Sequence, residues 1–180
     1  MAEKLPIFTV DLEDWNHALH TVKGGHSSVE SVYFLLDLLE KYNVKAIFYV
    51  LGRFRNEFPN VLDAIEAKGH ILGDHGYYHD HGERQVYAFP KLLYRSPYWD
   101  TTPMPTPPSG GFFFRVLPLA YVLWAVRRSG TFWIHPHDLD EGHPKIDNPL
   151  MNWKRHVGLK GSRAKLDKLL SDITWGDPNG

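Results

Sequence analysis

The sequence of 180 residues contains no cysteine and no excess of charge of either sign. Without cysteine, disulfide bonds and thiolate metal sites are excluded, whereas the 11 histidines leave imidazole ligation open. Twenty Lys and Arg residues stand against 21 Asp and Glu residues, a net charge of -1, so no overall field draws the chain to nucleic acid or to anionic lipid. We therefore expect no nucleic-acid partner, and we expect any metal to be held by nitrogen and oxygen atoms.

Long hydrophobic runs are also missing. A membrane-spanning helix needs roughly 18 to 20 uninterrupted apolar residues, and the nearest candidate, residues 112–126, is broken by Arg115 and Pro118. Residues 1–4 show neither the basic region nor the apolar region of a signal peptide. These features predict a protein without a membrane span and with a cytoplasmic location.

The sequence does contain an alternation of strand-like and helix-like segments. With 43% hydrophobic and 23% charged residues, its composition is typical of one globular domain, which we expect over residues 1–180. Apolar runs rich in β-formers predict strands, and apolar positions at helical spacing predict helices. The expected strands are residues 5–10, 45–51, 70–73 and 131–134, and the expected helices are about 27–42, 61–67, 114–128 and 162–173. This order predicts an α/β fold with a parallel sheet, whose functional residues lie at the carboxyl ends of the strands.

Between these segments, residues 89–108 include six prolines, which remove amide donors and forbid a regular helix or central strand. We expect a long ordered loop or a lid there. Within it, residues 95–99 could offer the Arg95 guanidinium, a backbone donor and an aromatic wall to a sugar. Plain loop packing is the alternative.

Three carboxylates, Asp11, Glu13 and Asp14, follow the first predicted strand within four residues. Burying them together is costly without a cation, because each carboxylate loses its hydration and repels the others. A bound metal would relieve that cost. The alternative is an acidic turn exposed to solvent.

Histidines follow two other predicted strands. His75 and His79 are four residues apart, which on a helical turn brings both imidazoles to one side, where they can share a divalent ion. Two histidines and one carboxylate leave positions open for water and substrate, as in catalytic zinc sites. His135 follows the strand at 131–134, where it could protonate a leaving amine while a neighbouring carboxylate holds its tautomer. For each of these histidines the alternative is a purely structural hydrogen bond.

Taken in chain order, these residues resemble the polysaccharide deacetylase family of carbohydrate esterases. Residues 8–15, FTVDLEDW, are similar to its first motif in the form D-x-E-D-W, and residues 73–79 to its H-x-x-x-H motif. The later stretches 108–115, 132–136 and 155–170 are similar to the C-terminal part of a bacterial branch associated with surface polysaccharides. The resemblance implies a distorted (β/α) barrel of about seven strands. We expect that barrel to be incomplete, because only 15 residues separate His79 from Arg95, where the family has a longer helix and strand.

The resemblance also implies a metal centre with named ligands. His75 and His79 would bind one divalent ion, zinc being the expected one and cobalt, nickel or iron the alternatives. An acidic residue of the first motif would complete the set. Because Leu12 lies beside Asp11, that ligand would be Asp14 or Glu13, and we favour Asp14.

The remaining catalytic roles follow from the same resemblance. Asp11 would be the general base and His135 the general acid. Arg95 would orient the base, and the backbone near Tyr98 would help to bind the oxyanion.

The function implied is hydrolysis of an N-acyl group, acetyl or formyl, from an amino sugar or a polysaccharide precursor, as in lipopolysaccharide synthesis. The same chemistry could act on a non-sugar amide, because the metal does not distinguish what carries the amide. The alternative of another class is a catalytically inactive carbohydrate-binding protein that retains the metal site. The oligomeric state is left open by the sequence.

Overall fold

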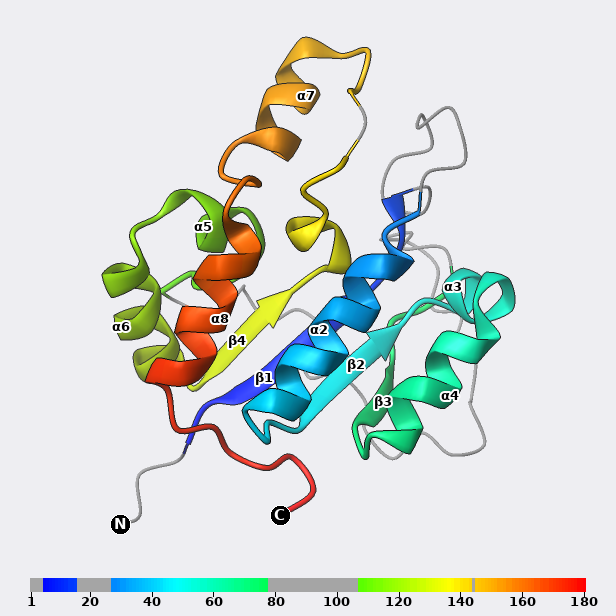
Figure 1. The fold of residues 1–180 in the computed structure, drawn as a ribbon, viewed down its shortest axis with the longest axis vertical. Helices are drawn as coiled ribbons and strands as arrows, with labels where there is room; N and C mark the ends of the chain where they lie inside the picture. The colour runs from blue at the N-terminus through cyan, green and yellow to red at the C-terminus, as the bar shows by residue number, and fades with distance from the viewer. Residues whose placement is uncertain (1–4, 16–26, 78–106, 144) are drawn as a thin grey trace.

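The structure, a computed structural model, describes residues 5–15, 27–77, 107–143 and 145–180. Within these ranges the chain forms a parallel sheet with the strand order β3-β2-β1-β4 (Figure 1). The strands are β1 (Ile7–Leu12), β2 (Ala46–Val50), β3 (Ile71–Asp74) and β4 (Thr131–Ile134). The α/β prediction is confirmed, and each of the four predicted strands is present within two residues of its expected bounds.

The sheet is held together through β1, which pairs with β2 on one side and β4 on the other. Val10 of β1 lies opposite Phe48 of β2 and Ile134 of β4, and all three side chains are buried. All residues of β2 are buried, as expected for a strand covered on both faces of a parallel sheet. Phe8 and Phe132 pack across the β1–β4 pair with their ring centroids 5.1 Å apart. This pairing joins the first and last strands of the sheet, which lie more than 100 residues apart in the chain.

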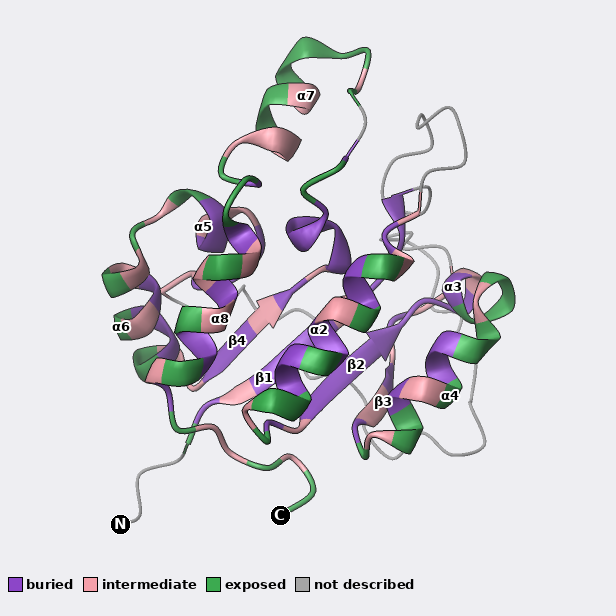
Figure 2. Ribbon diagram, viewed as in Figure 1, coloured by how far each residue is buried: buried purple, intermediate pink, exposed green. Residues whose placement is uncertain are grey.

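Helices cover the sheet with their apolar sides turned inward. The longest, α2 (Val29–Lys41), buries Val32, Leu35, Leu36 and Leu39, and Figure 2 shows its purple inner side and green outer side. The other helices beside the sheet are α3 (Gly52–Glu57), α4 (Pro59–Ala67), α5 (Gly111–Val116), α6 (Leu119–Ser129) and α8 (Ser162–Asp172). None of the helices in the described ranges has the length and apolar content of a membrane span.

The prediction of one helix over residues 114–128 was wrong, because the chain forms α5 and α6 there. Pro118 separates the two helices, with a backbone ψ of 145° that is extended rather than helical. Proline lacks the amide hydrogen that a helix interior requires and its ring clashes with the preceding turn, so the helix stops and restarts. Gly130, in the left-handed conformation at φ 73°, then ends α6.

Two elements that the sequence analysis did not predict follow β4. A 3-10 helix, η1 (Pro136–Leu139), turns the chain at the strand end, and α7 (Pro149–His156) comes after it. Figure 1 shows α7 projecting beyond the edge of the sheet to which the strand arrows point, while the C-terminus lies at the opposite end. We call residues 141–161, which carry α7, the arm.

Candidate active site

The carboxyl ends of β1, β3 and β4 bring an acid and two histidines together. The Oδ1 atom of Asp11 lies 4.0 Å from Nδ1 of His75, which follows β3. The other carboxylate oxygen of Asp11 lies 3.9 Å from Nε2 of His135, which follows β4. The structure therefore places Asp11 between the two histidines, as expected for residues at one edge of a parallel sheet.

Of the remaining two carboxylates of the first motif, Glu13 faces this cluster. Glu13 and Asp14 follow the end of β1 at Leu12, and their side chains point to different places, Glu13 toward His135 and Asp14 toward the start of α2. Oε1 of Glu13 lies 3.3 Å from Nε2 of His135, and the Glu13 side chain is buried.

Asp14 points away from this cluster and binds the residues at the start of α2. Its Oδ1 atom accepts hydrogen bonds from the backbone amides of Trp15 and Ser28 and from the Ser28 hydroxyl, at 2.7 to 2.9 Å. Asp14 thereby ties the end of β1 to the start of α2. This geometry favours Glu13 over Asp14 as the carboxylate that faces a metal, although the Asp14 assignment stays a prediction.

Behind the cluster, His135 is fixed by a buried carboxylate. Its Nδ1 atom lies 2.9 Å from Oδ2 of Asp138, which also accepts the His135 backbone amide at 3.1 Å. Both contacts form because η1 turns residue 138 back toward residue 135. With its Nδ1 hydrogen donated to Asp138, His135 directs Nε2 toward Asp11 and Glu13.

Asp138 is itself held by Arg115 of α5. The Nε atom of Arg115 donates to Oδ1 of Asp138 at 2.8 Å, and both side chains are buried. The other guanidinium nitrogens donate to the backbone oxygens of Lys154, Arg155 and Val157 at the C-terminal end of α7. Arg115 therefore connects the His135–Asp138 pair to the arm.

These contacts shift the pKa values of the three groups in directions that suit acid–base chemistry. Burial raises the pKa of Asp11 to about 6, although the nearby His135 opposes the rise. Burial alone would lower the pKa of His135, but the Asp138 hydrogen bond and the charges of Glu13, Asp138 and Asp11 raise it to about 9. Burial also opposes ionisation of Asp138, yet its bond to His135 and the nearby cations hold its pKa well below the usual range. Near neutral pH, Asp11 can accept a proton while His135 can donate one.

A second set of side chains that could hold a metal ion shares Glu13 and His135 with this cluster. Glu13, His135 and His137 each offer an atom within 4.8 Å of the others. The His137 ring stacks on His135 at 4.4 Å, and its Nε2 atom lies 2.8 Å from Nη1 of Arg155. Because a guanidinium can only donate, Nε2 of His137 accepts that hydrogen bond, and the same cation would repel a metal there. The Arg155 contact therefore argues against His137 as a metal ligand.

The predicted residues His79 and Arg95 lie outside the described residues, so their roles stay predictions. Within the described residues, the structure adds Arg115, Arg155 and His137 to the surroundings of the site. In the sequence, Arg115 stood out as a charged residue inside the apolar run 112–126 and as the last residue of the family-like stretch 108–115.

Two family models match the chain. The model described as "Polysaccharide deacetylase" matches residues 24–91, and the model described as "Domain of unknown function (DUF3473)" matches residues 77–179, more than half of the chain.

Curated relatives match parts of the sequence. The peptidoglycan-N-acetylglucosamine deacetylase of Bacillus cereus is 44% identical over 45 residues, which are 25% of this chain and 16% of that protein. The peptidoglycan-N-acetylmuramic acid deacetylase PdaA of Bacillus subtilis is 24% identical over 161 residues, covering 77% of this chain and 59% of that protein. The chain thus spans less than two thirds of the length of either relative.

Solved structures share the fold. A CE4 family pseudoenzyme from Bacillus anthracis has a TM-score of 0.54 at 14% identity, over 99% of this chain and 65% of that chain. A mutant of the peptidoglycan deacetylase PdaC from Bacillus subtilis has a TM-score of 0.52 at 14% identity, over 97% of this chain and 87% of that chain. At this identity the likeness shows the fold alone, and it supports the predicted distorted, incomplete barrel.

Proposed function

Because the chain belongs to the polysaccharide deacetylase family, and residues 77–179 also match the DUF3473 model, we propose that it is a metal-dependent hydrolase. It would remove an N-acyl group from an amino sugar of a polysaccharide or its precursor. The observation that carries the proposal is the position of Asp11 between His75 and an Asp138-backed His135. The relatives named as peptidoglycan deacetylases favour an N-acetylated amino sugar as the substrate.

The metal would be held by Glu13 and His75, with His79 as the further predicted ligand. These side chains offer oxygen and imidazole nitrogen atoms, which suit zinc, and Glu13 and His75 are buried beside Asp11. A bound divalent ion polarises an acyl carbonyl and lowers the pKa of a water molecule.

Asp11 would serve as the general base. Its pKa of about 6 leaves it ionised at neutral pH, yet basic enough to accept a proton from the attacking water. Its second oxygen faces His135, so base and acid share one side of the cluster.

His135 would serve as the general acid that protonates the departing amine from Nε2. Asp138 accepts the Nδ1 hydrogen and thereby fixes the tautomer and orientation of the ring. Arg115 positions Asp138 without facing the reacting groups, since its nitrogens point to Asp138 and to backbone oxygens of the arm.

The test is acetate release from N-acetylated chito-oligosaccharides and from peptidoglycan fragments by the zinc-loaded protein. We expect the wild type to release acetate and Asp11→Asn to release at least a hundredfold less while it retains its zinc. Asp167→Asn, which alters an exposed carboxylate paired with Lys41, is the matched control and should keep full activity. A zinc-loaded wild type that binds these glycans but releases no acetyl or formyl group would favour the inactive carbohydrate-binding alternative.

A further inference from the structure

The arm carries a helix whose polar and apolar sides are reversed relative to those of the helices beside the sheet. No residue of α7 is buried, and Figure 2 shows α7 in green and pink without the purple inner side of α2. In a helix of a globular protein, the apolar side normally faces the core. The direction in which α7 turns its side chains therefore requires another explanation.

The side of α7 turned toward the protein is polar. Oδ1 of Asn152 accepts the amide hydrogen of Ile146 at 2.8 Å. Nδ1 of His156 lies 2.8 Å from the backbone oxygen of Asn152, and its Nε2 lies 3.1 Å from the backbone oxygen of His143. Arg155 reaches His137, and Arg115 binds the carbonyls at the end of α7. Hydrogen bonds rather than apolar packing hold this helix in place.

The side turned to solvent is apolar. Leu150 is 71% exposed and Trp153 is 58% exposed, the two highest values for large apolar side chains among the described residues. They are three positions apart, so they share one side of the helix. Trp153 contacts the ring of Phe112 at a centroid distance of 6.4 Å and is otherwise open to solvent over more than half of its surface.

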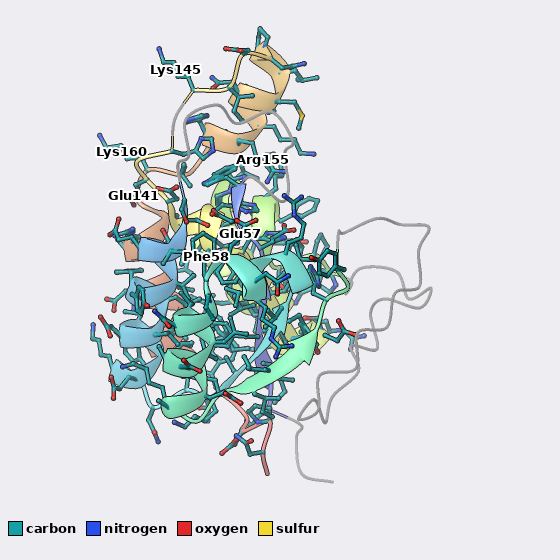
Figure 3. The ribbon with its side chains drawn as sticks, turned by 90° about the vertical axis from the view of Figure 1, so that its right-hand side faces the viewer. Glu57, Phe58, Glu141, Lys145, Arg155 and Lys160 are labelled. Atoms are coloured by element: carbon teal, nitrogen blue, oxygen red, sulfur yellow. The ribbon has the colours of Figure 1, made fainter. Side chains whose placement is uncertain are left out.

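Three lysines lie in the same arm as this apolar pair. Lys154 lies within α7, and Lys145 and Lys160 lie in the segments before and after it; all three are exposed. Figure 3 shows Lys145 and Lys160 extending outward on the same side of the arm. The arm holds four Lys and Arg residues against two carboxylates, an excess of two positive charges on a chain whose net charge is -1.

We propose that the arm docks on an anionic lipid surface, with Leu150 and Trp153 entering the interface and the three lysines contacting the headgroups. A short helix with Trp and Leu on one side and Lys beside them is suited to lie in the plane of such an interface. Each lysine near an anionic surface contributes about 1 kcal/mol, and tryptophan prefers the headgroup level.

The size of the apolar patch argues against a second copy of the chain as its occupant. An eight-residue helix is about 12 Å long, and one side of it offers a few hundred Å² at most. A stable interface between two proteins needs roughly 800 Å² from each partner. A patch of this size suits weak, reversible attachment to a lipid surface, where apolar side chains and basic residues act together.

If the proposed function holds, this attachment has a consequence for the substrate. The arm projects from the edge of the sheet where Asp11 and His135 lie (Figure 1). A docked chain would turn that edge toward the membrane, where it could meet amino sugars of a glycan carried on lipid.

The test is co-flotation of the protein with vesicles of phosphatidylcholine alone and of phosphatidylcholine with 30 mol% phosphatidylglycerol. We expect binding to the anionic vesicles, weakened by high salt, and little binding to the neutral ones. Leu150→Ser/Trp153→Ser should reduce the partition coefficient at least tenfold. Removing the lysine charges (Lys145→Gln, Lys154→Gln and Lys160→Gln together) should also reduce it at least tenfold, because 1 kcal/mol per lysine corresponds to about fivefold each.

Trp124→Ser is the matched control, since Trp124 is 53% exposed on α6, away from the arm. It should bind like the wild type. Thermal unfolding of every variant tests whether the exposed substitutions leave the fold intact, and we expect wild-type transitions. Absence of binding to anionic vesicles, or equal binding by Leu150→Ser/Trp153→Ser, would overturn the proposal. Sedimentation showing a wild-type dimer that this double variant loses would assign the patch to a second copy instead. Neither readout depends on hydrolysis, so failure of the proposed activity would leave this result interpretable.

Discussion

The two halves of the chain contribute different chemistry to one cluster. Residues 5–77 supply Asp11, Glu13 and His75, whose side chains converge from β1 and β3. Residues 107–180 supply His135 with its partners Asp138 and Arg115, which are linked by hydrogen bonds of 2.8 and 2.9 Å. The N-terminal half thus offers carboxylate oxygens and an imidazole, to which we assign the metal and the general base, whereas the C-terminal half holds the hydrogen-bonded histidine to which we assign the general acid. The β1–β4 pairing brings the two together.

The largest expected effect on hydrolysis comes from removing the proposed proton donor, His135. His135→Gln removes the group that would protonate the amine, so we expect hydrolysis to fall about a thousandfold. Metal content should stay at the wild-type level, because His135 belongs to the other half of the site. Acetate release and elemental analysis on the same samples measure both. Full activity in this variant would remove His135 from the mechanism.

A smaller effect concerns the stability of the C-terminal unit. Arg115→Met leaves Asp138 buried without its cation and three carbonyls at the end of α7 without their donor. Breaking a buried ion pair in this way costs about 3 kcal/mol or more. The control Arg127→Met removes an exposed arginine that donates to the Asp172 carbonyl, and we expect it to cost well under 1 kcal/mol. Urea unfolding measures both free energies, and equal values would contradict the role given to Arg115.

The pH dependence of kcat/KM should distinguish the roles of Asp11 and His135. With Asp11 ionised above about pH 6 and His135 protonated below about pH 9, kcat/KM should follow a bell-shaped profile between these values. Asp138→Asn removes the hydrogen-bonded charge that raises the pKa of His135, so the upper limb should move to lower pH. The lower limb, set by Asp11 in the other half, should move less. A profile whose two limbs shift equally would contradict the division of roles.

The smallest effect concerns His70, a titratable residue of the N-terminal half outside the cluster. Burial, with help from Lys45 and Lys68, lowers its pKa to about 4, and its Nδ1 atom accepts the amide hydrogen of Ala46. The unfolded chain binds a proton near pH 6.5 and the folded chain does not. The stability that His70 contributes is therefore complete above pH 6.5 and is lost as pH falls toward 4.

In His70→Gln, the decrease in unfolding free energy between pH 7 and pH 4.5 should be about 2 kcal/mol smaller than in the wild type. Urea titrations at the two pH values measure this difference. An unchanged decrease would show that His70 is not buried in its neutral form.

The sequence predicted those parts of the fold that depend on local patterns. Short apolar runs predicted the four strands of the described ranges. The rule that parallel strands place their carboxyl ends together predicted the approach of Asp11, His75 and His135. Strand alternation could not decide between Glu13 and Asp14, because both residues follow the end of β1 at Leu12.

The rest depended on contacts between distant residues. Arg115 lies 23 residues before Asp138, and nothing in its apolar surroundings indicates a carboxylate partner. The break at Pro118 was visible in the sequence, but the good helix formers on both sides of it suggested one helix. Helix α7 was missed because hydrogen bonds hold it, donated by Arg115 to its last carbonyls and by the Ile146 amide to Asn152. Its apolar residues face outward instead of following a core-facing pattern.

The division between the two halves is tested most directly by the zinc content per chain of the wild type, His75→Ala and His135→Gln, measured by elemental analysis after equal loading. We predict about one equivalent in the wild type and in His135→Gln, and loss of zinc in His75→Ala. Zinc that is retained in His75→Ala but lost in His135→Gln would contradict this account. It would place the metal at Glu13, His135 and His137 and leave the proposed acid as a ligand.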